Sequence, residues 1–369
     1  MPDVPETMSA VILEEAGHPL HVRTIATPRP CAGGVVVKIL YTWVDASILT
    51  ILSGKAPSFS FPIPMVPGTR AIGRIATLGP DSTSMRVGGL VLLEPNVRAR
   101  DDPNVQFIWG AYGGSTKASP KLAADNWRHG CMAEFALAPL ENCWPLNEDV
   151  LCNRLGYSLE DLLHLTVAAV PYGGLRAINL QPGETILIAP ATGRFSGAAV
   201  GVAVAMGATV VAVGRRQEVL DELKAKHGRV TTVHLKGTDD DVAAILRDAG
   251  PVDVYLDFSP PAASGAQHLR ACFEAVRKHG RVALMGIIKD GVPMPYSTVM
   301  WKSLTIRGQY VYQPEGFQSL IRLAESGLLK LGNDAGQRII GRFALDDFSR
   351  AFEADERYGN ALQSVVLRP

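Results

Sequence analysis

The chain has 369 residues, with 36 Lys and Arg against 36 Asp and Glu, and 47% of its residues are hydrophobic. This length predicts two domains, and the balanced charge gives no reason to expect nucleic acid or an anionic membrane surface as a partner. The longest apolar run, 198–206, is too short to span a bilayer, and the first residues show no secretory signal.

Five cysteines are scattered along the chain without a close Cys-x-x-Cys pair: Cys31, Cys131, Cys143, Cys152 and Cys272. Their odd number and wide spacing fit a reducing compartment better than a disulfide framework. The sequence therefore predicts a cytoplasmic protein.

The first part of the chain is rich in short β-type runs separated by turn residues. The clearest predicted strands are 8–13, 35–40, 71–78, 90–93 and 132–138. They indicate an all-β barrel or sandwich rather than alternating strands and helices. Residues 94–130 form a long polar insert, in which Trp109, Tyr112 and Trp127 favour an ordered lobe over disorder.

From Ser158 the pattern becomes helical, with a serine cap, acidic residues in the first turn and a leucine-rich face to about residue 170. Residues 171–174 (PYGG) are expected to interrupt this helix, and 175–179 to resume it.

After residue 180, predicted strands alternate with predicted helices. Strands are expected at 185–189, 209–213, 231–235, 252–258, 281–287 and 304–312, with helices at 197–206, 217–227, 239–249 and 268–278. This alternation predicts a doubly wound parallel sheet. Three later elements have no crossover left to join: helices at 317–326 and 345–357, the latter capped by Asp346, and a strand at 362–367. They are expected to return to the first domain, which gives domains of 1–154 with 314–369 and of 155–313.

The unit 185–216 has the strand–turn–helix–strand order of half a dinucleotide-binding fold. In its turn, the three glycine positions of G-x-G-x-x-G are taken by Pro190, by Gly193 and by Ser196 or Gly197. An ordinary βαβ crossover without a ligand is the alternative interpretation. The second strand ends in Gly214-Arg215-Arg216, where an acid would bond a ribose 2′-hydroxyl. Two arginines suit a 2′-phosphate instead, so we expect NADP(H); the alternative is that they begin a helix in solvent.

The candidate cofactor-binding residues are Pro190, Ala191, Thr192, Gly193, Phe195, Ser196, Gly197, Gly214, Arg215 and Arg216.

Several stretches, in their order and spacing, resemble the medium-chain dehydrogenase/reductase superfamily over nearly the whole chain. They are VPGTRAIGRIATLGPDS, GCMAEFALAPLENCWPL, LQPGETILI with the ATGRFSG turn, and GRVALMGI. The resemblance implies an α/β protein with a Rossmann doubly wound parallel sheet, a GroES-like β-rich domain and a substrate cleft between them.

Zinc-dependent members of that superfamily carry a Cys-His pair, a Gly-His-Glu and a third ligand ahead of the nucleotide domain. The first two regions here read Thr42-Trp43-Val44-Asp45 and Gly68-Thr69-Arg70, and 168–175 contains neither Cys nor His. The insert 94–130 lacks the cysteines of a structural zinc lobe. Catalytic zinc takes about three protein ligands. We therefore expect no metal site and a resemblance to the zinc-independent quinone-reductase and enoyl-reductase branches.

The resemblance places Thr42 and Trp43 nearest the nicotinamide and a small-molecule substrate, with Asp45 as a buried hydrogen-bonding anchor. It also brings Tyr172 to the cleft as a proton donor, although simple packing is an alternative role for this tyrosine. The predicted function is NADPH-dependent reduction of an activated C=C or C=O. The alternative is a non-redox catalyst or binding protein on the same scaffold. An apolar edge strand at 304–312 predicts a homodimer.

Overall fold

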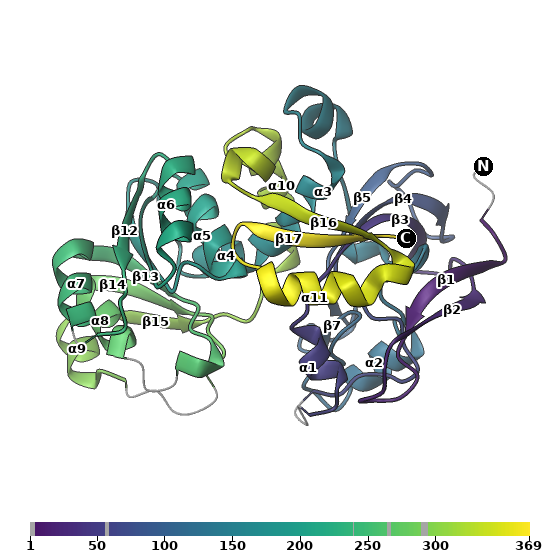
Figure 1. Cartoon of the computed structure of the whole chain (residues 1–369), viewed down its shortest axis with the longest axis horizontal. Coiled ribbons are helices and arrows are strands. Elements are labelled where there is room, and N and C mark those ends of the chain that lie inside the picture. Colours follow the sequence, from purple (N-terminus) through teal and green to yellow (C-terminus); the bar gives the residue numbers. More distant parts are fainter. Residues whose placement is uncertain (1–3, 56–58, 239, 264–266, 289–293) are drawn as a thin grey trace. The chain divides into compact units, whose positions relative to one another are not determined.

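The computed structural model describes residues 4–55, 59–238, 240–263, 267–288 and 294–369. The chain divides into two compact units (Figure 1). Unit 1 comprises Met1–Thr166, Arg338–Gly359 and Gln363–Pro369, and unit 2 comprises Val167–Gln337 and Asn360–Leu362.

Unit 1 is built on a seven-stranded sheet with strand order β16-β17-β3-β4-β5-β9, in which β8 also pairs with β3. The strands are β3 (Gly34–Trp43), β4 (Ala71–Leu78), β5 (Leu90–Leu93), β8 (Phe135–Pro139), β9 (Cys143–Pro145), β16 (Arg338–Ala344) and β17 (Gln363–Arg368). A separate hairpin joins β1 (Thr7–Ile12) to β2 (His21–Ala26). The predicted β-rich domain is confirmed, and its five predicted strands correspond to β1, β3, β4, β5 and β8.

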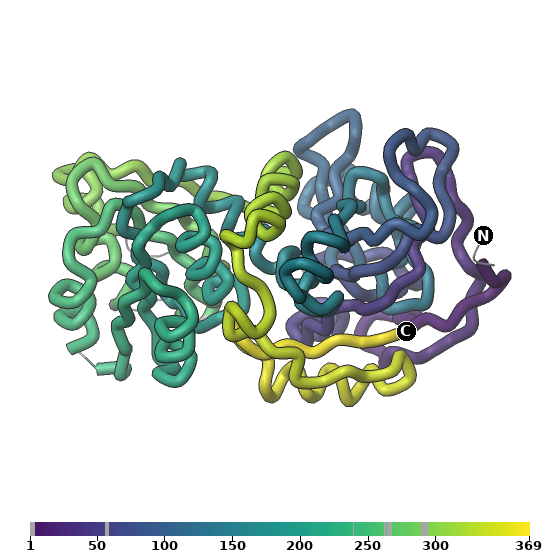
Figure 2. Tube along the Cα trace, turned by 90° about the horizontal axis from the view of Figure 1, so that it is seen from above, coloured from purple at the N-terminus to yellow at the C-terminus, as the bar shows by residue number. Residues whose placement is uncertain are grey.

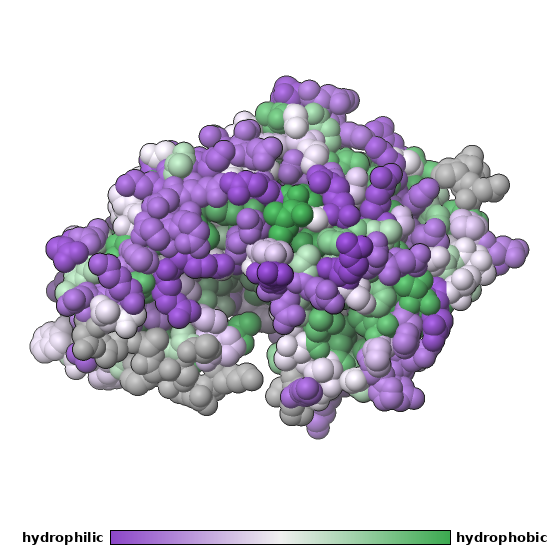
Figure 3. All heavy atoms as spheres, viewed as in Figure 1, coloured by the Kyte–Doolittle hydropathy of each residue, from purple (hydrophilic) through white to green (hydrophobic). Residues whose placement is uncertain are grey.

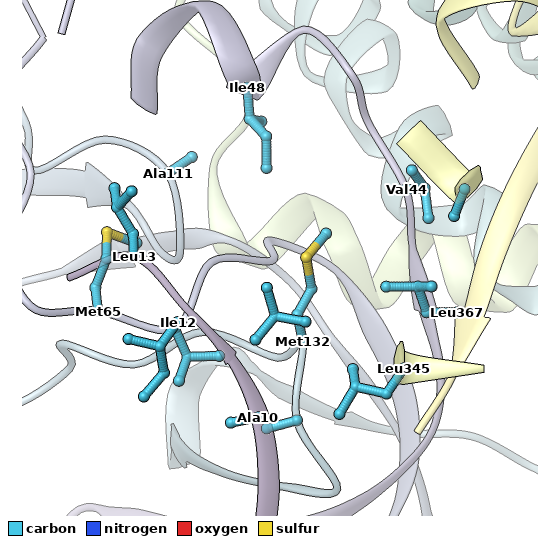
Figure 4. Packing of buried hydrophobic residues seen from close by; sticks show 14 of the residues in the cluster. Ala10, Ile12, Leu13, Val44, Ile48, Met65, Ala111, Met132, Leu345 and Leu367 are labelled. Atoms are coloured by element: carbon cyan, nitrogen blue, oxygen red, sulfur yellow. The ribbon is translucent and has the colours of Figure 1, made fainter. Parts of the chain in front are cut away.

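The main core of unit 1 draws on residues that are far apart in the sequence (Figure 4). Ala10 and Leu13 pack in one buried cluster with Met132, and Leu345 and Leu367 close the same cluster from the C-terminal part of the chain. Because these side chains exclude water together, the first and last strands depend on one another for burial.

Residues 94–130 form an ordered lobe, as predicted. It contains β6 (Asn96–Arg98), β7 (Gln106–Ile108) and α2 (Ser119–Asp125). Trp109 is fully buried in it, and its indole Nε1–H donates to the carbonyl oxygen of His129 at 2.8 Å.

Unit 2 contains a six-stranded parallel sheet with strand order β12-β11-β10-β13-β14-β15. Its strands are β10 (Thr185–Ala189), β11 (Thr209–Gly214), β12 (Val230–His234), β13 (Val252–Asp257), β14 (Val276–Leu284) and β15 (Thr305–Gly308). The predicted doubly wound parallel sheet is therefore confirmed. The strand order reverses between β10 and β13, and at such a switch point the strand ends leave a crevice for ligands.

The helices of unit 2 are α4 (His164–Ala177, beginning in unit 1), α5 (Arg194–Ala205), α6 (Gln217–Lys226), α7 (Asp240–Ala249), α8 (Gln267–Ala275), α9 (Tyr296–Trp301) and α10 (Pro314–Glu325). Unit 1 holds α1 (Ile48–Leu52), α3 (Leu159–Leu162) and α11 (Phe348–Tyr358). Short helical turns occupy Leu140–Asn142, Asp149–Arg154, Pro261–Ala263, Gly332–Ala335 and Leu345–Asp347.

Helix α4 corrects the predicted break at residues 171–174, because it runs without interruption through Pro171. Its glycines serve close packing instead. A Cβ on Gly173 would stand 2.4 Å from the carbonyl oxygen of Val311. The glycine is therefore required by a neighbouring backbone and does not end the helix.

The C-terminal region returns to unit 1 later than predicted. Helix α10 belongs to unit 2, whereas β16, α11 and β17 belong to unit 1. Figure 2 shows the last, yellow part of the chain lying beside the N-terminal elements, and Val366 pairs with Trp43 in the sheet. The predicted cap of α11 at Asp346 is also wrong, since a short turn over Leu345–Asp347 precedes the helix.

No helix in the described parts of the chain is long and apolar enough to cross a membrane. The face in Figure 3 is mostly hydrophilic, with separate hydrophobic patches.

Candidate active site

The turn after β10 leads directly into the N-terminus of helix α5. Gly193 is the extended N-cap residue of α5, and its N–H donates to the Ser196 hydroxyl oxygen at 3.1 Å. The N–H of Ala191 donates to the carbonyl of Val213 at 2.7 Å, which fixes the turn to the end of β11. Because α5 begins at Arg194 and not at residue 197, Phe195, Ser196 and Gly197 lie in its first turn.

The exposed N–H groups at a helix N-terminus favour an anion, and α5 is long enough to present one. Thr192 in the turn is buried, whereas Gly193 and Arg194 are half-buried. The turn and the first residues of α5 thus combine backbone donors with a guanidinium group at one end of the helix.

Gly214 ends β11 directly beneath this turn. A Cβ at that position would stand 2.6 Å from Cγ2 of Thr192, so packing of the turn over the strand requires glycine here.

The two arginines that follow β11 have different surroundings. Arg215 is exposed, whereas Arg216 is half-buried and its guanidinium donates to the carbonyl of Thr192. Burial holds the pKa of Arg216 below its ordinary value, although Glu218 opposes this shift. Arg215 therefore has the guanidinium that is open to a ligand, and Arg216 fixes the turn.

Sequence reasoning did not single out two charged residues near this turn. Arg194 stands inside the predicted turn sequence and adds a third guanidinium there. Asp257 ends β13 and is paired in register with Ala189, the last residue before the turn. Its position was recognisable as the last residue of a predicted buried strand, but the strand order that brings it beside β10 was not.

Tyr172 lies inside α4 and is 7% exposed. The guanidinium of Arg176 stands 5.8 Å from its ring centroid, and the described residues give its hydroxyl no hydrogen-bond partner. A phenol in this state has a donor and an acceptor available for a bound molecule.

Thr42 and Trp43 occupy the buried end of β3. The Thr42 hydroxyl donates to the carbonyl of Arg70 at 2.9 Å and lies 3.1 Å from the Cys131 sulfur. The Trp43 ring makes an edge contact with His164 at 5.1 Å. Both side chains are at most 1% exposed, and their described contacts are with other residues of unit 1. Their expected place beside a substrate stays a prediction.

Asp45 accepts local hydrogen bonds, but it is half-buried and not buried as predicted. Its Oδ1 accepts from the N–H and the hydroxyl of Ser47, and its Oδ2 lies 4.0 Å from Arg70.

The comparisons with known proteins agree with this architecture. The model of the alcohol dehydrogenase GroES-like domain matches residues 32–148, and the model described as zinc-binding dehydrogenase matches residues 196–326. The chain belongs to the medium-chain dehydrogenase/reductase superfamily. It is an oxidoreductase of that superfamily.

Among the curated relatives, an L-threonine 3-dehydrogenase of Salmonella paratyphi B is 27% identical over 361 residues, covering 96% of this chain and 92% of the relative. Two solved structures share the fold. The 2R,3R-butanediol dehydrogenase of Bacillus subtilis has a TM-score of 0.77 and 20% identity, covering 98% of this chain and 99% of its own. A short chain alcohol dehydrogenase of Escherichia coli CFT073, in complex with NADH, has a TM-score of 0.78 and 19% identity. The match covers 99% of this chain and 100% of the dehydrogenase.

Because one matching family description names zinc, the donor set of this chain was compared with a zinc site. Cys131 is fully buried, and its sulfur lies 3.1 Å from the Thr42 hydroxyl. Arg70 is 8% exposed and places a cation near Asp45. In the described ranges no three His, Cys, Asp or Glu side chains are grouped to hold a metal ion. These residues do not fit catalytic zinc.

Proposed function

We propose that this protein is an NADP(H)-dependent oxidoreductase that works without zinc on a small organic substrate. It moves a hydride between the cofactor and a C=O or activated C=C group. The observation that carries the cofactor proposal is the exposed Arg215 directly after β11, beside the N-terminus of α5.

Arg194 begins α5 directly after the turn, Arg215 and Arg216 directly follow β11, and no acid stands before Glu218. An acid at the end of this strand would bond the ribose 2′-hydroxyl of NAD(H) and repel the 2′-phosphate of NADP(H). Arginine forms charge-assisted, often bidentate bonds with phosphate. The turn residues would therefore hold the pyrophosphate, and Arg215 would hold the 2′-phosphate.

The cofactor, when bound, supplies or accepts the hydride. The protein then has to orient the substrate and move one proton, since reduction of a C=O group places a hydride on carbon and a proton on oxygen. We assign the proton donor to Tyr172, because the described residues leave its hydroxyl without a partner. Arg176, over the tyrosine ring, adds positive charge where negative charge develops on the substrate oxygen.

The substrate class follows from what the chain lacks and from its relatives. Without a metal to polarise a carbonyl, substrates already polarised by conjugation, such as enones and quinones, are favoured. The names of the relatives add small alcohols and the corresponding ketones to this list.

The decisive experiment is a fluorescence titration of the intact protein with NADPH and with NADH. It is followed by a panel of enones, quinones, aldehydes, ketones and alcohols, monitored at the nicotinamide absorbance in both directions. We expect NADPH to bind about ten- to a hundredfold more tightly than NADH, from charge-assisted bonds worth about 1.5–3 kcal/mol.

Elemental analysis of the purified protein is expected to find less than one zinc ion per chain. One zinc ion per chain would contradict the proposal.

Tyr172→Phe is expected to lower turnover about ten- to a hundredfold, less than a typical general acid because water can substitute. Cofactor affinity is expected to stay unchanged, since the ring and its contact with Arg176 remain. Arg176→Gln is the companion variant, because it removes the charge and keeps the tyrosine. Full turnover by Tyr172→Phe would reduce the tyrosine to a packing role.

A second candidate function is a non-redox catalyst or binding protein on this scaffold. The bond from Arg216 to the Thr192 carbonyl favours it, because that bond uses a group otherwise available to a nucleotide. Tight NADPH binding without reduction of any substrate on the panel would support this second function.

A further inference from the structure

A compact cavity in unit 2 lies outside the residues assigned to the cofactor. It has a volume of about 140 Å³ and is lined by the ends of β13 and β14, by α8 and by the residues that lead into α9. Its walls are mainly apolar, from Leu269, Phe273, Leu284, Ile288 and Met294. No residue of the turn 190–197 or of 214–216 lines it.

The carboxyl group of Asp257 is the exception in this apolar lining. The Asp257 side chain is 3% exposed, and three donors share its Oδ1: the Tyr255 hydroxyl at 3.1 Å, the Ser259 N–H at 3.1 Å and the Ser259 hydroxyl at 2.5 Å. These bonds fix the orientation of the carboxyl group. They also use one of its two oxygens fully.

The other oxygen, Oδ2, accepts no hydrogen bond from the described residues. It lies on the side of Gly286, which also lines the cavity: a Cβ on that glycine would stand 2.5 Å from Oδ2. A carboxylate oxygen in a mainly apolar lining favours a bound donor, because the surrounding side chains offer it no hydrogen bond. The cavity therefore presents one strong acceptor to any molecule inside it.

The neighbouring charged groups do not provide the missing donor. Arg270 lines the cavity but pairs with Glu274 at 2.9 Å. His268 contacts the far side of the network, with its Nε2 3.3 Å from the Ser259 hydroxyl, and burial lowers its pKa, so it stays neutral at neutral pH. Lys302 is engaged by the carbonyls of Glu274 and Val276.

We propose that this cavity is a binding site for a compact organic amine, in which an apolar ring or branched chain carries one primary ammonium group. The ammonium would donate to Oδ2 of Asp257, and the apolar body would fill the space between Leu269, Phe273 and Leu284. The volume suits about one six-membered ring, since an apolar cavity of about 150 Å³ holds benzene. The charge supplies the selectivity, because hydrogen bonds between ionised groups are about twice as strong as neutral ones.

The test is calorimetric titration of the full chain with benzylamine and with benzonitrile, which has the same ring and the same number of heavy atoms but no donor. Benzylamine is expected to bind with a dissociation constant of about 1 mM or lower. Its preference over benzonitrile should be about ten- to a hundredfold. Equal affinities, or no benzylamine binding at about 10 mM, would overturn the proposal. Because no cofactor is needed, failure of the proposed redox function leaves this test unaffected.

Three variants test whether benzylamine binds in this cavity. Asp257→Asn keeps Oδ1 for its three donors and replaces Oδ2 by an amide N–H, so it should weaken benzylamine binding at least about tenfold. Asp253→Asn is the matched control on the same strand, because Asp253 bonds to Thr185 and Arg277 instead. Phe273→Trp fills the cavity with a larger side chain and should also weaken benzylamine binding. It replaces Asp257→Asn as the test if that variant fails to fold. Unchanged benzylamine affinity in a folded Asp257→Asn or Phe273→Trp variant would overturn the proposal.

Discussion

Arg215 and Arg216 show how neighbouring residues of one type divide two tasks. Both follow the same strand, yet one guanidinium is exposed and the other bonds to the turn above it. The sequence indicates positive charge at this strand end, but it does not indicate which side chain folds back, because that depends on packing of the turn.

Single substitutions should separate these tasks. Arg215→Ala is expected to lower NADPH affinity about tenfold, the loss of one charge-assisted hydrogen bond, with NADH affinity and stability unchanged. Arg216→Ala should weaken both cofactors, because it also releases the Thr192 carbonyl, and should lower the free energy of unfolding by about 1 kcal/mol. Fluorescence titration and urea unfolding measure these effects. An unchanged NADPH preference in Arg215→Ala would show that this arginine is only a solvated surface residue.

His227 gives the protein a pH dependence of stability. The ring is 6% exposed against α5, and burial, helped by the nearby charge of Lys330, lowers its pKa to about 4. With an unfolded pKa of about 6.5, the unfolded state binds more protons below that value. The stability contributed by the neutral ring is therefore complete above about pH 6.5, falls as pH drops and is lost below about pH 4.

We expect this ring to account for about 1–3 kcal/mol of the difference in unfolding free energy between pH 7 and pH 4. His227→Gln should flatten that part of the profile, measured by urea unfolding at a series of pH values. His234→Gln is the control, because that histidine is less buried. A profile unaltered by His227→Gln would contradict the assignment.

Strands of the parallel sheet were the most predictable elements. Continuous β-branched runs such as Thr185–Ala189 and Thr209–Gly214 match the structure closely, because a strand buried on both faces leaves a run without polar residues. Helix ends were predicted less well. The helix expected to reach residue 278 ends at Ala275, where β14 begins, and sheet pairing with β13 overrides the local helical pattern there.

Helix α4 shows why glycine and proline alone mislead. The predicted break rested on residues 171–174, but the helix continues and uses Gly173 to approach the backbone of Val311. The information that keeps this helix intact lies about 140 residues away in the sequence, so no local pattern contains it. For the same reason, the burial of Thr42 and Trp43 was not predictable, because it depends on the later strand β17 and on His164.

Substitution of this glycine is a direct test. Gly173→Ala should lower the free energy of unfolding by about 1–3 kcal/mol, because the new methyl group would press on the backbone of Val311 and Tyr312. Gly316→Ala in α10 is the matched control, since its nearest neighbour would be 3.5 Å away, and it should be neutral or stabilise by up to about 1 kcal/mol. Chemical unfolding measures both. Equal stabilities of the two variants would mean that α4 can move away from Val311.

Unit 2 presents an apolar surface around its edge strand. Strand β15 ends the sheet, and Tyr296, Trp301 and Tyr310 nearby are 78%, 73% and 52% exposed. An unpaired strand edge beside exposed aromatic residues is an association site, and a twofold dimer satisfies it with a second copy of the same surface. We propose that the protein is a homodimer through this edge.

Light scattering should then give a mass twice the 39.5 kDa of one chain at micromolar concentration. Trp301→Lys should shift the population toward single chains, because it places charge in the apolar surface. Tyr358→Lys in α11 of unit 1 is the control, because it is an exposed aromatic residue that does not belong to the proposed surface of unit 2. If the unaltered protein has the mass of a single chain, the homodimer proposal is wrong.

The late position of β17 in the chain has a consequence for synthesis on the ribosome. This strand lies between β16 and β3, so the sheet of unit 1 is incomplete until residues 363–368 have been translated. Nearly all of unit 2 is made earlier, from Val167 to Gln337. Domains generally fold as they emerge, N-terminal first. Here the order is reversed: the second unit can mature during translation, while the first must wait with an open strand edge, exposed to chaperones, for the end of its own sheet.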